Sequence, residues 1–161
     1  MCGTRHRDRT CPDRPHGEHG RGTYPEVVRT ERQVVDYALR RRSLLAQYRA
    51  GRVGDDDICD AQPHLLQAAK FHGQPSDDPC PVCRREHLSE VSWVFGEELK
   101  QAANSARAPE ELARMATLFE EFNVYVVEVC RTCGWNHLVL SYVLGTGADR
   151  RGPRRRRRAA E

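Results

Sequence analysis

The sequence has almost no lysine and no hydrophobic run long enough to cross a membrane. Only Lys70 and Lys100 are lysines among the 26 basic residues, a bias toward arginine that is typical of a GC-rich bacterial genome. The longest apolar stretches, at 124–127 and 138–143, fall far short of the roughly 18 residues that a membrane helix needs. The start, "MCGTRHRDRTC", holds no apolar segment that could act as a secretory signal. We therefore expect a cytoplasmic protein without membrane contact.

The common sequence signatures of catalysis are also missing. The chain has no glycine loop of the kind that binds phosphate, no Gly-x-Ser-x-Gly and no His-Glu-x-x-His. Pairs of adjacent glutamates occur at 97–98, 110–111 and 120–121. Neighbouring side chains on a helix point about 100° apart, so these pairs are expected to be solvated charges and not acid/base partners. We expect no enzyme activity.

Charge is distributed unevenly along the chain. Residues 1–23 hold five arginines and three acidic residues, and residues 149–161 hold seven arginines and two acidic residues. Residues 24–148 hold 14 basic and 18 acidic residues, a net charge of −4. Because nucleic-acid binding calls for a basic face, this distribution disfavours nucleic acid as the partner of the central part.

The two ends and the centre of the chain differ in composition. Residues 1–23 and 149–161 contain almost nothing apolar, so they cannot offset the entropy of ordering and are predicted to be disordered basic tails. The remaining residues, 24–148, have the length of one domain.

Helices are predicted between residues 24 and 73. Pro25 suits the first turn of a helix, and apolar residues then recur every three or four positions until Gly51 ends the pattern. We expect this apolar stripe to pack on the rest of the domain. Two short helices follow, one capped by an aspartate of 55–57 and one running from Pro63 to Gly73. The stripe comprises Val28, Val34, Val35, Ala38, Leu39, Leu45 and Tyr48.

Three strands are predicted at 88–95, 123–129 and 135–144, where β-branched and aromatic residues are frequent. A helix is predicted from Pro109, with an apolar side that reaches Phe122. The segment "QPSDDP" is expected to be a turn. The expected fold is α+β, with N-terminal helices packed on a three-stranded antiparallel zinc-ribbon-like sheet that carries an inserted helix.

Four of the seven cysteines form two pairs with C-x-x-C spacing, Cys80 with Cys83 and Cys130 with Cys133. In a reducing cytosol, paired cysteines are more often metal ligands or redox groups than disulfides. A structural zinc ion takes four tetrahedral ligands, and each C-x-x-C turn can present two. We predict that these cysteines bind one structural zinc ion. The 46 residues between the pairs exceed the roughly 15–20 of the compact zinc pattern, and the strand at 88–95 and the inserted helix account for the excess.

Other roles for these cysteines stay open. Four thiolates can also hold iron. A redox dithiol at Cys80 and Cys83 would need a strand before the motif and a helix after it, which the sequence does not predict. Gly134 follows the second pair, where a positive φ closes the turn easily, whereas Arg84 takes this place after the first pair.

Residues near the cysteine pairs are expected to be structural. Because four cysteines complete the zinc shell, His137 is predicted to be a surface residue of its strand. Trp135 is predicted to pack over its turn, and Cys59 to be a small buried residue on a short helix. Cys2 and Cys11 are expected to have no role.

Three stretches together resemble an actinobacterial family of small proteins of unknown function. They are "DYALRRRSLLAQYRAGR", "CPVCRREHL" and "YVVEVCRTCGWNHLV", and the Cys59-Asp60-Ala61 step also matches. The resemblance covers roughly residues 34–144 and neither tail. It implies an actinobacterial, cytoplasmic source and no assigned reaction.

Two classes of function remain. We predict a non-catalytic structural-zinc interaction module that docks on a protein partner. The alternative, by analogy of fold, is a nucleic-acid- or transcription-associated zinc-ribbon factor. Weak, non-specific contact with nucleic acid is expected through the tail arginines. These are Arg150, Arg151, Arg154, Arg155, Arg156, Arg157 and Arg158.

Overall fold

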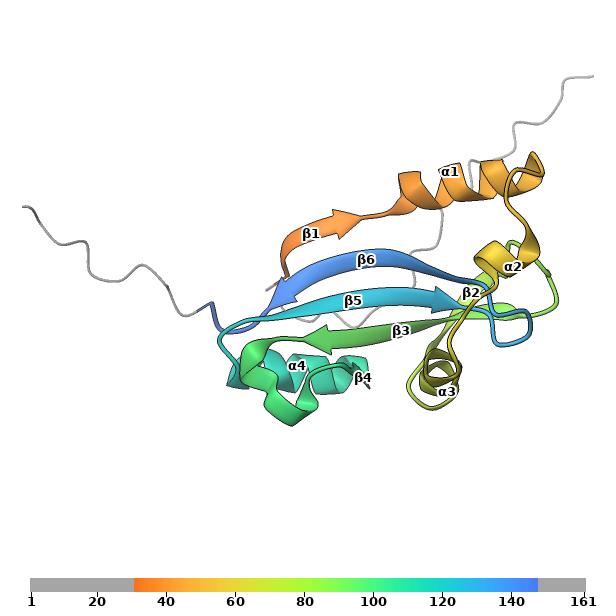
Figure 1. Cartoon of the computed structure of the whole chain (residues 1–161). Helices are drawn as coiled ribbons and strands as arrows, with labels where there is room; N and C mark the ends of the chain where they lie inside the picture. The colour runs from red at the N-terminus through yellow and green to blue at the C-terminus, as the bar shows by residue number, and fades with distance from the viewer. Residues whose placement is uncertain (1–30, 148–161) are drawn as a thin grey trace, which may run out of the picture.

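The structure is a computed structural model that describes residues 31–147 (Figure 1). The predicted tails, Pro25 and Val28 lie outside the described residues. In chain order the elements are β1 (Arg32–Asp36), α1 (Ala38–Arg49), α2 (Asp55–Ile58), α3 (Pro63–Phe71), β2 (Gln74–Pro79), β3 (His87–Phe95), the 3-10 helix η1 (Glu97–Ala102), β4 (Ser105–Arg107), α4 (Pro109–Leu118), β5 (Phe122–Val129) and β6 (Asn136–Leu144).

An antiparallel sheet organises the described part of the chain. Its strand order is β1-β6-β5-β3-β2, and β4 also pairs with β3. The three predicted strands form its centre, with β5 paired to β3 and to β6. The expected three-stranded sheet is nevertheless wrong, because the sheet has six strands. The mixed α and β class is confirmed.

The additional strands are short or polar, which explains why their sequences did not predict them. The segment "QPSDDP", expected to be a turn, is β2. It lies at an edge of the sheet, where proline is tolerated because one side of the strand needs no hydrogen bonds. β4 has only three residues, and β1 pairs with β6 through a register shift between Arg32 and Val35.

The predicted helix that ends before Gly51 forms only from Ala38 to Arg49, so its predicted start and its apolar stripe are wrong. Val34 and Val35 lie in β1, and α1 begins only at Ala38. Leu39 is 74% exposed, whereas Leu45 is 5% exposed and packs into the core. The valines favour extended backbone, and Val35 pairs with Ser141 of β6. The two short helices do form, as α2 and α3.

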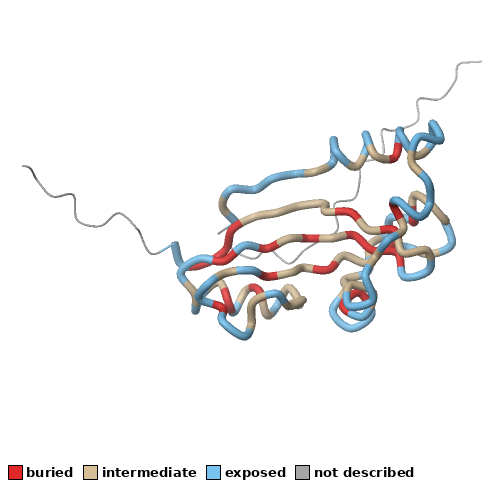
Figure 2. Tube along the Cα trace, in the orientation of Figure 1, coloured by how far each residue is buried: buried red, intermediate tan, exposed pale blue. Residues whose placement is uncertain are grey.

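Helices cover both faces of the central strands. Side chains alternate between the faces of a strand, so Val124 and Val126 point to the opposite face from Val127 and Val129. The first face packs against α4 and η1, and the second packs against α3. Buried positions recur along these strands (Figure 2).

The inserted helix starts where expected and ends earlier. Pro109 is its first residue, and the carboxylate of Glu111 accepts a hydrogen bond from the backbone N–H of Ala108 at 3.1 Å. The helix ends at Leu118, and Phe122 begins β5. Glu98 likewise accepts a hydrogen bond from the backbone N–H of Glu120 at 3.0 Å. Some of the paired glutamates therefore bind backbone groups and are not only solvated charges. Within residues 31–147, no helix has the length and apolar character needed to cross a membrane.

Candidate metal centre

Two tight turns, each carrying one cysteine pair, meet at one end of the sheet. The first cysteine turn (80–84) lies between β2 and β3, and the second cysteine turn (130–134) joins β5 to β6. β3 and β5 are antiparallel neighbours with Ser89 opposite Val129. The start of β3 therefore lies beside the end of β5, and the sheet register brings the two turns together.

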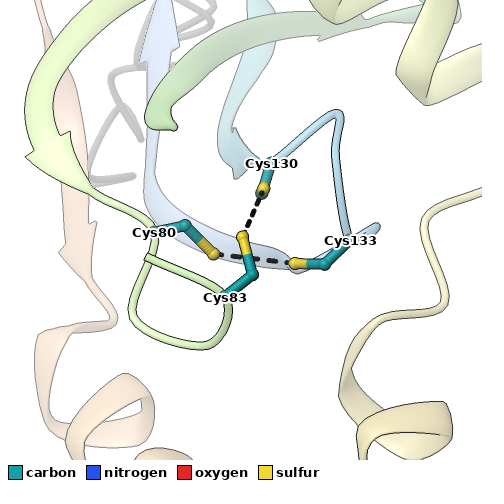
Figure 3. Close-up of side chains that lie close together, drawn as sticks. All are labelled: Cys80, Cys83, Cys130 and Cys133. Carbon is teal, nitrogen blue, oxygen red and sulfur yellow. Dashed lines mark hydrogen bonds between the residues drawn. The ribbon is translucent and has the colours of Figure 1, made fainter. Parts of the chain in front are cut away.

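The four predicted ligands converge in the space between these turns (Figure 3). Their Sγ atoms all lie within 4.8 Å of one another. Two cross-turn distances, Cys80 to Cys133 and Cys83 to Cys130, are both 3.6 Å. A tetrahedral ion with Zn–S bonds of about 2.3 Å would place its sulfur atoms about 3.8 Å apart, whereas a disulfide needs about 2.05 Å. The arrangement thus fits four separate thiols that could hold one metal ion.

The two cysteine turns have the same backbone hydrogen bonds. The N–H of Arg84 donates to the carbonyl of Cys80 at 3.2 Å, and the N–H of Gly134 donates to the carbonyl of Cys130 at 2.9 Å. Both donors have positive φ, 54° at Arg84 and 84° at Gly134. The first turn therefore adopts the same conformation as the second although it has no glycine at this place.

A close backbone contact explains why glycine occupies position 134. A Cβ atom there would lie 2.7 Å from the carbonyl oxygen of Cys59. The carbonyl of Gly134 in turn accepts a hydrogen bond from the N–H of Ala61 at 3.0 Å. The segment after α2 is therefore held directly against the second cysteine turn.

Burial opposes ionisation of the second cysteine pair. It raises the pKa of Cys133 to about 12, although the backbone N–H of Trp135 acts in the opposite direction. Burial likewise raises the pKa of Cys130 far above its usual value. At Cys83 burial also acts to raise the pKa, but the backbone N–H of Arg85 and the neighbouring thiols outweigh it and the pKa is lowered. A cation bound among these thiols would supply the charge that favours the thiolates.

Comparisons with known proteins show which family this chain resembles. Residues 28–159 match a family of unknown function (DUF5318). The chain belongs to this family. The uncharacterized proteins Rv0049 of Mycobacterium tuberculosis (strain ATCC 25618 / H37Rv) and Mb0050 of Mycobacterium bovis (strain ATCC BAA-935 / AF2122/97) are each 62% identical to it over 120 residues. Each alignment covers 74% of this chain and 88% of the relative. No solved structure matches the chain.

Membership of the DUF5318 family confirms the resemblance to an actinobacterial family of unknown function. One detail of the resemblance is corrected. The family match extends to residue 159, so it includes the arginine segment that we expected to lie outside it.

Glu86, which the sequence did not single out, ties the two cysteine turns of this DUF5318 protein together. Its carboxylate accepts a hydrogen bond from the backbone N–H of Thr132 at 2.8 Å and lies 3.4 Å from Sγ of Cys130. Its backbone carbonyl accepts from the N–H of Cys80 at 2.9 Å. Burial acts to raise the pKa of Glu86, but the hydrogen bond from Thr132 and its neighbours outweigh it, so the pKa is lowered. Its position three residues after Cys83 was the only signal available.

Trp135 packs behind the second cysteine turn, as predicted, and has no exposed surface. Its Nε1 donates to Oε1 of Glu128 at 3.0 Å, and Nε of Arg41 donates to the same oxygen at 2.6 Å. Glu128 is buried, so the arginine from α1 compensates a charge that would otherwise be costly. Sequence reasoning missed this link because Arg41 lies 87 positions from Glu128.

His137 is not the surface residue that we predicted. Only 8% of it is exposed, and its ring stacks on Trp135 with centroids 6.0 Å apart and planes 7° apart. Burial lowers the pKa of His137, and the nearby charge of Glu128 only partly counteracts this. The reason for the burial is α1, whose residues Arg40 and Leu44 share with His137 the wall of a pocket of about 500 Å³.

Cys59 differs in part from the prediction. It follows the last residue of α2 and is half-buried instead of fully buried. Burial raises the pKa of Cys59, and the neighbouring thiol of Cys133 acts in the opposite direction. The predicted set of four ligands thus has a fifth thiol beside it. Cys2 and Cys11 lie outside the described residues.

Proposed function

We propose that Cys80, Cys83, Cys130 and Cys133 bind one structural zinc ion and that the protein is a non-catalytic module that docks on a protein partner. The observation that supports this most strongly is the convergence of four thiols from two distant turns within 4.8 Å. Four protein ligands would leave no coordination position for a substrate or a reactive water. Zinc is favoured over iron because closed four-cysteine sites of this kind are typical of structural zinc.

The surroundings of the first cysteine turn argue against a redox dithiol. Such dithiols need a helix N-terminus to lower the pKa of the first thiol. Here β2 precedes Cys80 and β3 follows Cys83. Each of these thiols also approaches a cysteine of the second turn, which would complete a four-ligand shell.

A protein partner is favoured by charge and by exposed apolar residues. Residues 31–147 hold 13 basic and 17 acidic residues. Val34, Val35 and Leu39 are exposed near the start of the described chain. One feature favours the alternative, a nucleic-acid- or transcription-associated factor, because α1 carries the basic run Arg40, Arg41 and Arg42. Arg41 is already engaged with Glu128, so this basic surface is small.

The metal proposal is tested on the full chain by elemental analysis and thermal unfolding. We expect one zinc ion per chain, and we expect Cys130→Ser to lose the metal and to melt at a much lower temperature than the parent. Structural zinc contributes on the order of 10–16 kcal/mol in small zinc-finger peptides, which matches or exceeds the total stability of about 5–15 kcal/mol of a domain. Cys59→Ser is the matched control, since it removes a neighbouring thiol and should keep the metal. Absence of stoichiometric metal, or a Cys130→Ser protein that melts like the parent, would refute the proposal.

The nature of the partner is tested by affinity purification from native lysate with and without nuclease. A protein partner should be retained after nuclease treatment. Loss of all bound material on nuclease treatment would favour the nucleic-acid alternative.

A further inference from the structure

One face of the sheet is only half covered. Ala68 and Ala69 of α3 pack over Val91 and Val129, which have no exposed surface. Beyond α3 the same face continues with Trp93 of β3 and Tyr125 of β5, which lie opposite each other in the register. In the part of the chain that the structure describes, α3 reaches this second half only at its first turn, where the ring of His64 meets that of Trp93 edge to face with centroids 5.7 Å apart.

A pocket of about 390 Å³ opens on this uncovered half, with an aromatic wall. Trp93, Tyr125 and Phe95 line it, and Phe95 is 39% exposed. The rings of Phe95 and Tyr125 meet edge to face at 81°, with centroids 5.4 Å apart. Rings at different angles around one space can present both faces and edges to a ligand.

The charged groups at the rim favour a cationic ligand. Asp60 lines the pocket, whereas no lysine or arginine of the described residues does. Oδ1 of Asp60 accepts a hydrogen bond from Nδ2 of Asn136 at 2.9 Å, which orients the carboxylate and leaves it a second oxygen for a ligand. A guanidinium group is flat, stacks on aromatic faces and pairs with carboxylates, so it matches this combination.

The chain itself contains such a ligand within reach. The described residues end at Gly147, whose N–H donates to the carbonyl of Glu120. Leu144, the last residue of β6, pairs with Phe122 of β5, and Phe95 of the pocket wall pairs with the adjacent Asn123. The chain therefore leaves β6 at the end of the sheet where the pocket wall begins. Three further residues of β5 lead to Tyr125, a distance of about 10 Å at about 3.4 Å per residue. Residues 148–158 can span about 36–40 Å at about 3.3–3.6 Å per residue.

We infer that the C-terminal arginine segment, residues 150–158, binds in this aromatic pocket of the same chain. Arginine side chains of the segment stack on Trp93 or Tyr125 and pair with Asp60. The seven arginines of the segment complement the net charge of −4 of residues 31–147. The family match includes this segment together with the sheet. The inference does not depend on the metal centre, and it implies that the bound segment is withheld from nucleic acid.

The indole signals of the two tryptophans provide a test on the full chain by ¹⁵N NMR. Trp93 lines the pocket, whereas the fully buried Trp135 serves as an internal control. The parent is compared with a variant in which Arg154, Arg155, Arg156, Arg157 and Arg158 are replaced by serine. We expect the Trp93 signal to move and the Trp135 signal to stay, and we expect the free peptide RRGPRRRRRAAE to restore the parent position of Trp93. High salt should move the parent signal toward that of the variant.

A charge-matched pair of further substitutions locates the binding site. In the serine variant, Asp60→Asn should weaken peptide binding about two- to fivefold, as expected for the loss of a solvent-accessible ion pair. Asp77→Asn, which removes an exposed aspartate of β2, should leave peptide binding unchanged. Equal Trp93 signals in the parent and the serine variant at low salt would overturn the inference. A parent signal that changes with protein concentration would also overturn it, because the occupant would then be the tail of a second copy.

Discussion

Gly134 and Arg84 occupy equivalent places in the two cysteine turns but are constrained by different forces. Both have positive φ, which costs a residue with a Cβ about 1–2 kcal/mol. Arg84 tolerates this cost. At Gly134 the carbonyl of Cys59 adds a steric limit, since a Cβ would approach it to 2.7 Å.

Gly134→Ala is therefore expected to destabilise the protein more than Gly51→Ala. Gly51 has a φ of 69°, and a Cβ there would meet no atom within 4 Å, so this control isolates the backbone cost of about 1–2 kcal/mol. We expect Gly134→Ala to add a further loss of about 1–3 kcal/mol, as for other overpacked positions. Urea unfolding of both variants in the presence of Zn²⁺ measures the difference. Equal losses would show that the segment after α2 moves away from the turn at little cost.

At the residue scale, the sequence predicted what depends on local spacing. The four candidate ligands and the packing of Trp135 followed from positions close to one another in the chain. The burial of His137 could not be predicted in the same way, because the helix that covers it lies about a hundred residues earlier. The burial of Glu128 could not be predicted either, because its partner Arg41 comes from the same helix.

At the scale of elements, the central strands were predictable and the edges were not. β3, β5 and β6 carry hydrophobic side chains that pack against helices on both faces of the sheet, which gives a clear strand pattern. β2 lies at an edge and is polar, so its sequence is typical of a turn. The apolar residues across 28–48 predicted one helix because the valines of β1 and the leucines of α1 follow the same three- or four-residue spacing.

Two leucines of α1 test this corrected assignment of the stripe. Leu45 is buried beside Trp135, so Leu45→Ala should cost about 2–5 kcal/mol. Leu39→Ala is the control and should change the free energy of unfolding by less than about 0.5 kcal/mol, because Leu39 is largely exposed. Denaturant unfolding of both variants gives the values. A similar large loss at Leu39 would mean that α1 packs more completely than the structure shows.

At the scale of the whole molecule, proton binding and metal binding are expected to oppose each other. Burial holds the pKa of Cys133 at about 12 and raises that of Cys130, so both thiols carry protons at neutral pH when no metal is bound. Metal binding should therefore release these protons. Calorimetric titration of the metal-free protein with Zn²⁺ in buffers of different ionisation enthalpy measures the number released. Release of no protons would show that the thiolates are already formed.

The same linkage between proton binding and folding predicts that the stabilities of the metal-free and the metal-bound protein depend on pH in opposite directions. In the metal-free protein the pKa of Cys133 is raised in the folded state, and this stabilises the fold at pH values below the usual thiol pKa of 9.0. The stabilisation is lost as the pH rises toward 12. In the metal-bound form the ligands are thiolates, so their protonation should destabilise the protein as the pH falls. Thermal unfolding across pH with and without a chelator compares the two. Parallel curves would contradict the proposed role of the four cysteines.

The pairing of β1 with β6 has a consequence for how the chain is made. Arg32 pairs with Val143, and the hydroxyls of Tyr37 and Ser141 lie 3.4 Å apart across 104 positions of sequence. Among the strands of residues 31–147, β6 is the only neighbour of β1 in the sheet order, so the earliest of these strands to be synthesised has no partner until the last of them is made. Contacts of such long range slow folding. Cys80 and Cys83 are likewise synthesised long before Cys130 and Cys133. During translation a growing chain therefore exposes an unpaired strand and the two thiols of the first cysteine turn.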